Sequence, residues 1–586
     1  MSETKRSHKA EKFIEEMGKR LNRQMVGSLL ACVHCGQCVD SCHYVQANPD
    51  DPTFAPPYKA DQIRKIFKRH YDWTGRVFPK WVKADTVMTD EDLEKLKDTV
   101  FGKCTNCRRC SINCPMGVDY ATFNRMARGC LVAVGVMPEG VATVSKDQWE
   151  IGNQMGVLKE EYLETLEWLS EELEDDYNDP KAAIPIDKED CEIVYTINPR
   201  EIKYDPRTIS DAAKIFYAAG ENWTMPSEGW DMTNFGLFSG DDQLGGAVAG
   251  RVYEKCDELR GNKLVQSECG HGYRSTTCEG PNWAKTDIKS FELESSVNTM
   301  LRYINTGRIK VDKTKNTEPI TFHDSCNNAR SCGLFEEPRE LLNLVVTDFR
   351  EMYPNRSENY CCTGGGGAMS MSEYTPDRLK SAKVKADQLK ATGATVVATS
   401  CHNCVDGLTD LIRHYKLDMK VVQLVNLVAN ALVVEKPVEI PEEVAVPAAA
   451  MELEGYKILV VDDEPDVCDF LSTVLEDNGA SVITATTGEE GLELVRKEKP
   501  DLMTLDLSMP GMDGGKVFEA LRNDPEIAAT PVCIISGKPE LRKLIYERPV
   551  RPPEGYLDKP IEEEGFLFNV RKILELADKP KETTVN

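Results

Sequence analysis

The spacing of apolar residues near the start of the chain predicts a helix. Over residues 9–30 the large apolar side chains recur at intervals of four, which is the helical period. These side chains are Phe13, Met17, Leu21 and Met25. We therefore expect one amphipathic helix there, with its apolar face packed on the chain's own core or docked on a partner subunit.

From residue 191 the pattern changes to short apolar runs that alternate with helical stretches. Such alternation is typical of α/β structure with parallel strands. The expected strands are 192–197, 263–266, 320–322 and 395–399. They form two similar α/β units within residues 186–434, which suggests a duplication in which only the second unit keeps a full set of thiols.

A further set of strands and amphipathic helices begins after residue 455. The expected strands are 457–461, 502–505, 532–535 and 556–557. This arrangement predicts a doubly wound parallel sheet with a ligand crevice at the carboxyl ends of the strands. Residues 435–454, rich in Pro, Val, Glu and Ala, read as an extended linker before it.

Composition narrows the possible functions. The chain has 586 residues, a length typical of about four domains. Its 71 basic and 97 acidic residues give a net charge of −26, which argues against a nucleic-acid partner. No apolar run approaches the length of a membrane span, so a membrane role would need a partner subunit. The polar N-terminus and 21 cysteines point to reduced, metal-binding thiols in the cytoplasm.

Two cysteine motifs carry the spacing of ferredoxin-type [4Fe–4S] sites. They are Cys32-x2-Cys35-x2-Cys38-x3-Cys42 and Cys104-x2-Cys107-x2-Cys110-x3-Cys114-Pro115. The fourth cysteine of such a motif binds the other cluster. The implied ligand sets are Cys32, Cys35, Cys38 with Cys114, and Cys104, Cys107, Cys110 with Cys42. Zinc would favour paired half-sites instead.

The first motif departs from the usual pattern. His43 stands where proline is expected, and an insert over residues 43–103 separates the two motifs. The insert contains Trp73 and Trp81, and it suits either a cap over the clusters or a docking surface.

Five more thiols fall within residues 323–404, and they are Cys326, Cys361, Cys362, Cys401 and Cys404. Adjacent cysteines are too close for an ordinary disulfide, because their Cα atoms lie only about 3.8 Å apart. Ligation of one metal assembly explains the set better. The glycine run 364–367 would let backbone approach a cluster, although a phosphate loop is the alternative.

Polar residues next to these thiols have two possible roles. They are His323, Asp324, His271 and His402, and they would either move protons or donate hydrogen bonds to cluster sulfur. The cysteines without ligand spacing are expected to be small core residues. They are Cys130, Cys191, Cys256, Cys278, Cys332, Cys468 and Cys533.

The C-terminal module places carboxylates after its strands. Asp462, Asp463 and Asp506 would make an oxygen-rich Mg²⁺ site. With Lys559 screening an incoming phosphate, Asp506 would act as the nucleophile.

That module resembles the response-regulator receiver domain over 455–580, including the run Met509–Gly514 and Tyr556 before Lys559. The resemblance implies phosphorylation of Asp506 by a histidine kinase or another phosphodonor, with a switch through Ser536 and Tyr556. One departure is a set of prolines that cannot all fit the usual fourth helix. They are Pro539, Pro549, Pro552 and Pro553. The last helix is expected over 566–576.

Residues 25–434 resemble the cysteine-rich (CCG) iron–sulfur proteins of the heterodisulfide reductase catalytic-subunit type, with greatest likeness to the DsrK-like branch. The runs 322–330, 333–339 and 268–271 carry the likeness beyond the thiols. It implies an unusual, noncubane [4Fe–4S] centre on the five thiols, with Cys269 as an extra or substitute ligand. Thr363 stands where the family often has glycine.

The domain plan is therefore a mixture of α+β and α/β parts. It comprises a two-cluster ferredoxin-type domain (1–130), a helical linker (131–185), the CCG domain (186–434), the extended linker (435–454) and the receiver domain (455–580).

The resemblance implies an electron-transfer oxidoreductase of anaerobic energy metabolism that cleaves or forms S–S bonds of a thiol carrier, fed by a membrane cytochrome b-type or flavoprotein subunit. Such a protein would lie in the cytoplasm, or peripherally on the membrane through its partner. Two alternatives stay open. One is an iron–sulfur relay without S–S chemistry, and the other is a phosphorylation-controlled signalling or docking protein.

Overall fold

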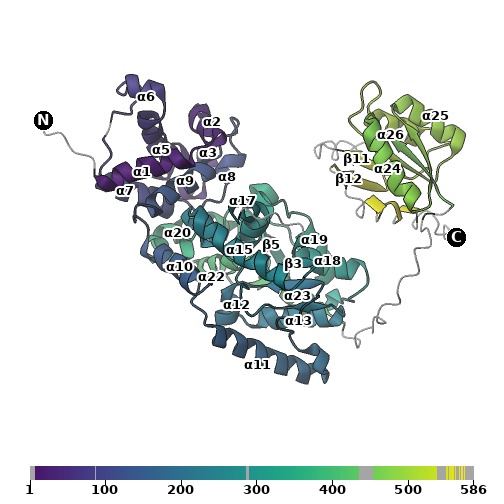
Figure 1. Ribbon diagram of the computed structural model, residues 1–586, viewed down its shortest axis with the longest axis horizontal. Helices are drawn as coiled ribbons and strands as arrows, with labels where there is room; N and C mark the ends of the chain where they lie inside the picture. The colour runs from purple at the N-terminus through teal and green to yellow at the C-terminus, as the bar shows by residue number, and fades with distance from the viewer. Residues whose placement is uncertain are drawn as a thin grey trace. The chain divides into compact units, whose positions relative to one another are not determined.

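The structure is a computed structural model, and it falls into two compact units, residues 1–439 and 440–586 (Figure 1). It describes residues 7–85, 87–284, 290–433, 453, 455–536, 550–551, 553–559, 561, 566–567, 569–571 and 573–574. The expected linker lies almost wholly outside these residues. None of the helices in the described part combines the length and apolar character that a membrane crossing requires.

The N-terminal region is helical, but it has two helices where the sequence predicted one continuous helix. The chain forms α1 (His8–Arg20) and α2 (Arg23–Ala31), with Leu21 and Asn22 extended between them. The Asn22 side chain accepts a hydrogen bond of 2.9 Å from the backbone N–H of Met25. Asn is a favoured N-cap, so it starts a new helix where the apolar period alone predicted one long helix.

The insert between the cysteine motifs belongs to the body of this domain. Its helices pack with α1 and α9 around one core, to which they contribute Ile63, Phe67, Leu93 and Leu96. Trp73 and Trp81 remain 69% and 80% exposed. The helices of the insert are α4 (His43–Ala47), α5 (Pro56–His70), α6 (Trp73–Val77) and α7 (Asp90–Lys97), and those beside the cysteine motifs are α3 (Gln37–Asp40), α8 (Arg109–Ile112) and α9 (Tyr120–Val132).

Two parallel sheets form the rest of the first unit, as the duplication predicted. The first has the order β2-β1-β3-β4 and the second the order β5-β6-β7. The strands are β1 (Ile193–Thr196), β2 (Trp223–Thr224), β3 (Lys263–Gln266), β4 (Glu292–Ser295), β5 (Ile320–His323), β6 (Val396–Thr399) and β7 (Lys420–Gln423). Residues of both halves share one hydrophobic core.

Helices cover these sheets and join the halves. The helix α11 buries Tyr162, Leu166, Leu169 and Leu173 in the shared core. The helices are α10 (Glu139–Glu150), α11 (Lys159–Tyr177), α12 (Pro199–Tyr204), α13 (Arg207–Ala218), α14 (Phe235–Ser239), α15 (Asp242–Glu258), α16 (Gly270–Tyr273), α17 (Gly280–Ala284), α18 (Ser296–Asn305), α19 (Glu337–Val345), α20 (Thr375–Ser381), α21 (Lys383–Thr392), α22 (His402–Tyr415) and α23 (Leu424–Ala431).

The strand ends of the two halves meet. His323 at the end of β5 is in register with Thr399 at the end of β6. Glu268, just after β3, accepts hydrogen bonds of 2.8 Å from the N–H groups of Leu424 and Val425 at the start of α23. A carboxylate at a helix N-terminus is favourable. Loops that follow strands of different sheets are thereby held side by side.

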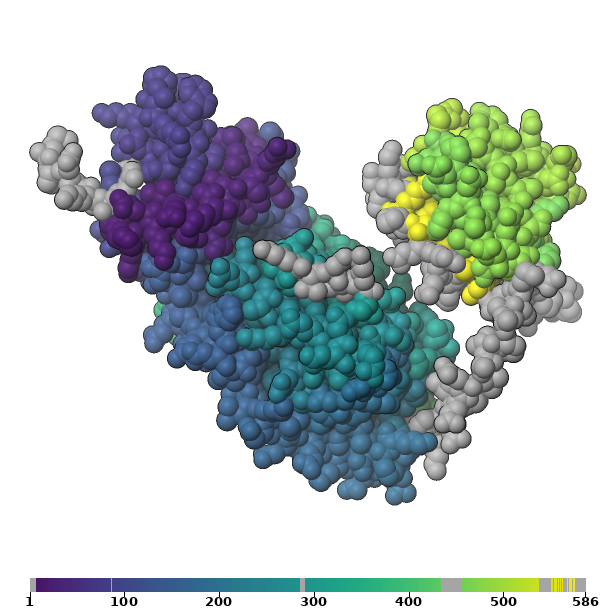
Figure 2. All heavy atoms as spheres, in the orientation of Figure 1, coloured from purple at the N-terminus to yellow at the C-terminus, as the bar shows by residue number. Residues whose placement is uncertain are grey.

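The N-terminal helices pack directly on this α/β body. In Figure 2 the purple and blue residues meet the teal residues without a gap. Arg128 of α9 donates hydrogen bonds to Phe238 O at 2.9 Å and to Gly366 O at 2.7 Å. The two redox domains are therefore one continuous structure.

The second unit has the predicted doubly wound fold. Its parallel strands follow the order β12-β11-β10-β8-β9. The strands are β8 (Lys457–Val461), β9 (Ser481–Ala485), β10 (Leu502–Asp506), β11 (Val532–Ser536) and β12 (Gly555–Asp558), and the helices are α24 (Pro465–Asp477), α25 (Gly488–Glu498) and α26 (Gly514–Asn523). Pro539, Pro549 and Pro552 lie outside the described residues, as does part of the expected last helix.

Candidate functional site

The five thiols of the cysteine-rich stretch converge in space. Cys326 follows β5 and begins a π-helical turn, Cys326–Ser331, while Cys401 caps α22 just after β6. The Sγ atoms of Cys362 and Cys404 lie 3.3 Å apart. All five thiols are free and buried. The arrangement of parallel strands therefore brings together side chains from three distant parts of the sequence.

Hydrogen bonds between these thiols shift their pKa values in opposite directions. The hydrogen bond from Cys404 lowers the pKa of Cys401 to about 6. The hydrogen bond to Cys361 and burial raise the pKa of Cys326 well above its usual value. Thiolates are the form that binds metal, so the site already stabilises negative sulfur at some positions.

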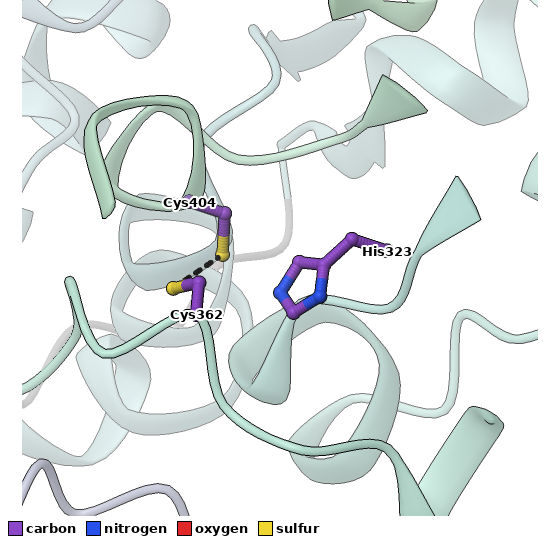
Figure 3. Close-up of side chains that lie close together, drawn as sticks. All are labelled: His323, Cys362 and Cys404. Atoms are coloured by element: carbon purple, nitrogen blue, oxygen red, sulfur yellow. Dashed lines mark hydrogen bonds between the residues drawn. The ribbon is translucent and has the colours of Figure 1, made fainter. Parts of the chain in front are cut away.

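His323 lies beside this group, and its ring faces two of the sulfurs. The ligand atoms of His323, Cys362 and Cys404 come within 4.8 Å of one another (Figure 3). Burial lowers the pKa of His323 well below its usual value, so the imidazole is neutral. Its Nε2 atom is buried and has no hydrogen-bond partner in the part of the chain that the structure describes.

A buried lysine fixes which nitrogen of His323 carries the proton. Lys385 Nζ donates to Asn359 Oδ1 at 2.6 Å, which turns the amide nitrogen of Asn359 toward His323 Nδ1 at 3.3 Å. Nδ1 therefore accepts, and the proton resides on Nε2. The unpartnered Nε2–H can donate to sulfur at the site.

Cys269 and His271 also border the five thiols. Cys269 is completely buried and accepts a hydrogen bond of 3.4 Å from Asn198 Nδ2. Its Sγ lies 3.3 Å from Nδ1 of His271, whose pKa burial lowers to about 3. A Cβ atom on Gly270 would lie 3.1 Å from Cys401 Sγ, so this loop runs against the thiol group.

The other two polar neighbours of the motif are held by other partners. His402 Nε2 lies 2.8 Å from Glu201 Oε1. Asp324 forms a buried, two-pronged ion pair with Arg339 at 2.9 Å. His402 Nε2 and the Asp324 carboxylate are therefore occupied by structural partners and are not directed at the thiols.

Two small cavities bring together the cysteines of the ferredoxin-type motifs. A cavity of about 20 Å³ is lined by residues that include Cys32, Cys35, Cys38 and Cys114. A second cavity, also of about 20 Å³, is lined by residues that include Cys42, Cys104, Cys107 and Cys110. In each cavity three cysteines of one motif meet the fourth cysteine of the other.

The second cavity adjoins the five-thiol site. A hydrogen bond between the Cys107 and Cys361 thiols raises the pKa of Cys107. Thr105 Oγ1 lies 3.5 Å from Cys361 Sγ. This adjacency was not foreseen, because nothing in the local sequence links Thr105–Cys107 with Cys361.

The glycine run makes close approach possible at this junction. Gly366 has a φ of +67°, and a Cβ there would lie 2.5 Å from Thr105 O. A Cβ on Gly364 would lie 2.2 Å from Asn403 O. Thr363 adopts a φ of +70°, and its buried Oγ1 has no hydrogen-bond partner among the described residues.

The site thus combines converging thiols, a glycine run that lies close to neighbouring backbone, and buried polar atoms without partners among the described residues. These features fit an iron–sulfur cluster.

The receiver unit gathers its predicted residues at the carboxyl edge of the sheet. Lys559 Nζ lies 2.9 Å from Asp462 Oδ2 and 3.3 Å from Asp506 Oδ1. Burial raises the pKa of Asp506. Asp463 follows Asp462 at the end of β8, and Ser536 ends β11 in register with Asp558. The Tyr556 side chain lies outside the described residues. Carboxylates clustered around a lysine fit a hard Mg²⁺ ion.

Two cysteines expected in the core are not buried. Cys278 is exposed and Cys332 is partly exposed, and their Sγ atoms lie 3.3 Å apart. The expectation was wrong because each lies at the far end of a short helical turn that reaches the surface. The remaining five cysteines of that set are buried as expected.

Three known domain families match the chain. Residues 28–118 match the 4Fe-4S dicluster domain, residues 320–408 the cysteine-rich domain and residues 458–571 the response regulator receiver domain. The chain is thus an iron–sulfur protein that carries a receiver domain.

Relatives extend over most of its length. An Hdr-like menaquinol oxidoreductase iron-sulfur subunit 2 from Archaeoglobus fulgidus is 26% identical over 74% of this chain and 85% of that protein. A dihydromethanophenazine:CoB–CoM heterodisulfide reductase subunit from Methanosarcina mazei is 25% identical over 71% of this chain and 97% of that protein. Protein PilH from Pseudomonas aeruginosa is 35% identical over 20% of this chain and 97% of its own length. Over most of its length the chain is therefore a homologue of heterodisulfide reductase-like iron–sulfur subunits, and it carries a C-terminal response regulator receiver domain.

Proposed function

We propose that this chain is an oxidoreductase of the heterodisulfide reductase type, which reduces or forms S–S bonds of a thiol carrier. The convergence of Cys326, Cys361, Cys362, Cys401 and Cys404 carries the proposal. Five thiols exceed the four that a regular [4Fe–4S] cluster needs, which supports an irregular, noncubane centre able to accept an outside sulfur. Cys269, which borders them, would serve as an extra or substitute ligand.

The dicluster domain would hold the electron relay. Cys32, Cys35, Cys38 and Cys114 would bind one [4Fe–4S] cluster, and Cys104, Cys107, Cys110 and Cys42 the other. The contact of Cys107 with Cys361 supports passage of electrons between the second cluster and the cysteine-rich site. When bound, the clusters supply one-electron chemistry.

The protein's own residues would stabilise sulfur charge and deliver protons. The Nε2–H of His323 would donate to sulfur between Cys362 and Cys404. Lys385 is completely buried, and burial lowers its pKa to about 7. Through Asn359 it holds His323 in the donating tautomer, so it acts as a positioning residue.

An anaerobic preparation of the full chain tests the proposal. Three four-iron clusters require about 12 iron atoms per chain. Addition of a small thiol to the oxidised protein should produce a new paramagnetic signal, absent from Cys362→Ser. If thiol produces no signal while all the iron is present, the chain is instead a plain electron relay for a flavoprotein or quinone-linked complex.

The receiver domain would add control by phosphorylation. A histidine kinase or small phosphodonor would phosphorylate Asp506, with Mg²⁺ on Asp462, Asp463 and Asp506, and with Lys559, Ser536 and Tyr556 in the response. The cluster of Asp462, Asp506 and Lys559 supports this proposal. Other redox subunits, of cytochrome b or flavoprotein type, would exchange electrons with the chain, and through them it would associate peripherally with the cytoplasmic membrane.

A further inference from the structure

Cys278 and Cys332 lie together beside the cysteine-rich site without being part of it. Cys278 belongs to the turn Arg274–Glu279, which continues the helix that begins after Cys269. Cys332 ends the turn that begins at Cys326. Even at the α-helical rise of about 1.5 Å per residue, six residues of helical turn span no more than about 9 Å. The pair is therefore close to the candidate cluster, at the surface end of two elements that start there.

The geometry of the pair suits reversible disulfide formation. The sulfurs are 3.3 Å apart, and a disulfide needs about 2.05 Å, so a small side-chain movement closes the bond. The more exposed thiol, Cys278, is open to an outside molecule, and the less exposed Cys332 stands behind it. This order of an accessible attacking thiol and a sheltered resolving thiol is what exchange chemistry requires.

The charges around the pair favour a reactive thiolate on Cys278. Its hydrogen bond with Cys332 and the nearby Arg274 guanidinium lower the pKa of Cys278 to about 7, against burial, which raises it. The same hydrogen bond raises the pKa of Cys332. Arg274 is held in place by Glu279 at 2.9 Å and Asn327 at 3.4 Å. Arg108, next to the predicted ligand Cys107, adds a second positive charge.

A metal site is a poorer explanation of this pair. Among the residues that the structure describes, three ligand atoms lie within 4.8 Å of one another at His323, Cys362 and Cys404, a group that includes neither Cys278 nor Cys332. Two thiols beside a fixed guanidinium lack the further ligands that a tetrahedral ion needs.

We propose that Cys278 and Cys332 form a redox-active dithiol that reacts with the disulfide of a thiol carrier by covalent exchange, at a site separate from the cluster cysteines. The carrier's identity as substrate rests on the function proposed above, but the exchange chemistry does not. The site would receive the carrier beside the cysteine-rich centre.

The exchange has two steps. The Cys278 thiolate attacks one sulfur of R–S–S–R′, forms a mixed disulfide and releases R–S⁻. Cys332 then loses its proton, attacks Cys278 Sγ and releases R′–S⁻. The two cysteines are oxidised by two electrons and the carrier is reduced to two thiolates. One of these takes the proton lost by Cys332, and the other takes a proton from solvent, where the Cys278 proton had gone. The reverse reaction uses a reduced carrier.

Trapping with oxidised glutathione tests this scheme on the full, anaerobically purified chain. In Cys332→Ser, we expect a single glutathione bound at Cys278, located by peptide mass. In Cys278→Ser, we expect at least tenfold slower modification at residue 332. The unaltered chain should form the Cys278–Cys332 disulfide and release two glutathiones. Cys191→Ser, which alters a buried cysteine elsewhere, should behave like the unaltered chain.

The inference is overturned if Cys278 and Cys332 both remain free thiols under oxidised glutathione, or if the adduct in the trapping variant lies elsewhere. Iron content and the thiol-dependent paramagnetic signal are measured on the same samples. Both are expected to persist in Cys278→Ser and Cys332→Ser. If the unaltered chain gives no thiol-dependent paramagnetic signal but still exchanges with glutathione, the proposed function is rejected and the exchange site remains supported.

Discussion

Arg128 in the dicluster domain donates a 2.7 Å hydrogen bond to the carbonyl of Gly366 in the cysteine-rich domain. The same guanidinium donates to Cys104 O at 2.6 Å and to Val100 O at 2.8 Å. A fully buried side chain thus joins a cluster-binding loop to the glycine run. The hydrogen bonds of this one residue therefore help to fix the relative position of the two redox sites.

Arg128→Met should therefore weaken the fold at the junction. The variant leaves several buried carbonyl oxygens without donors, and each such loss costs about 1–3 kcal/mol. We expect the free energy of unfolding to fall by about 3 kcal/mol or more, measured by urea titration. Arg23→Met, which alters an exposed arginine in α2, is the control and should change stability by less than about 0.5 kcal/mol. Equal stability of both variants would contradict the role given to Arg128.

Substitution of single cluster cysteines by serine should lower the iron content in steps of about four atoms, from a total of about 12 per chain. Cys362→Ser should remove the cysteine-rich centre and keep the other two clusters. Cys114→Ser should disturb the cluster of the first motif rather than that of its own motif, because it lines the cavity with Cys32, Cys35 and Cys38.

Iron analysis and low-temperature paramagnetic spectra check these losses. Cys191→Ser, at a buried position outside the predicted ligand sets, should retain all the iron. If Cys114→Ser altered only the signal of the second motif's cluster, the crossed ligand sets would be wrong.

Replacement of His323 should change the electronic properties of the cysteine-rich centre without dismantling it. The Nε2–H of His323 is placed to donate to sulfur, and such donors raise the potential of a cluster. We expect His323→Ala to lower the midpoint potential, with His323→Gln intermediate because its amide can still donate. Redox titration followed by paramagnetic resonance measures both. Unchanged potentials with full iron content would exclude a hydrogen bond from His323.

Phosphorylation should act through Asp506 alone. With Mg²⁺ present, acetyl phosphate should change the rate of electron transfer or the affinity for a redox partner in the unaltered chain but not in Asp506→Asn. Iron content should be equal in both, because the receiver holds no cluster cysteines. Removal of Mg²⁺ with EDTA should abolish the response, as should Lys559→Ala, which removes the cation 3.3 Å from Asp506. An identical response in Asp506→Asn would reject the regulatory proposal.

Asp231 should make stability depend on pH. Burial raises its pKa from 3.8 to about 7, although four donors surround it. The folded chain therefore binds more protons than the unfolded chain between about pH 4 and 7. Its contribution to stability is complete below pH 4 and is lost as pH rises through 7. In the unaltered chain, ionisation of Asp231 should lower the free energy of unfolding by up to about 1.4 kcal/mol per pH unit over this range. Asp231→Asn should remove that decrease.

The difference between variant and unaltered chain, measured by urea titration at several pH values, isolates this contribution from other titrating groups. Asp175→Asn, at an exposed position in α11, is the control. A parallel pH profile for Asp231→Asn and the unaltered chain would show that Asp231 is ionised throughout.

Sequence periodicity predicted the receiver fold and most of the strands, because buried strands such as 263–266 and 457–461 carry their own signal. It did not identify β2, β4, β7 and β9, which lie at the edges of their sheets. It missed the break at Asn22, where a local cap outweighed the apolar period. Cysteine spacing predicted which thiols belong together within a motif. It could not predict that Cys107 meets Cys361, or that Cys278 meets Cys332 across 54 residues, because these contacts depend on packing between domains and turns. The one available signal was that Cys278 and Cys332 each follow a predicted site cysteine by less than ten residues.

The close approach at Gly366 has an evolutionary consequence. A single methyl group on this residue would collide with the backbone of Thr105. The dicluster domain or the cysteine-rich domain can then be replaced by that of a homologue only if the contacting surface of the other domain comes from the same homologue. Chimeras cut between residues 130 and 190 should therefore assemble only when both sides of this contact come from the same lineage.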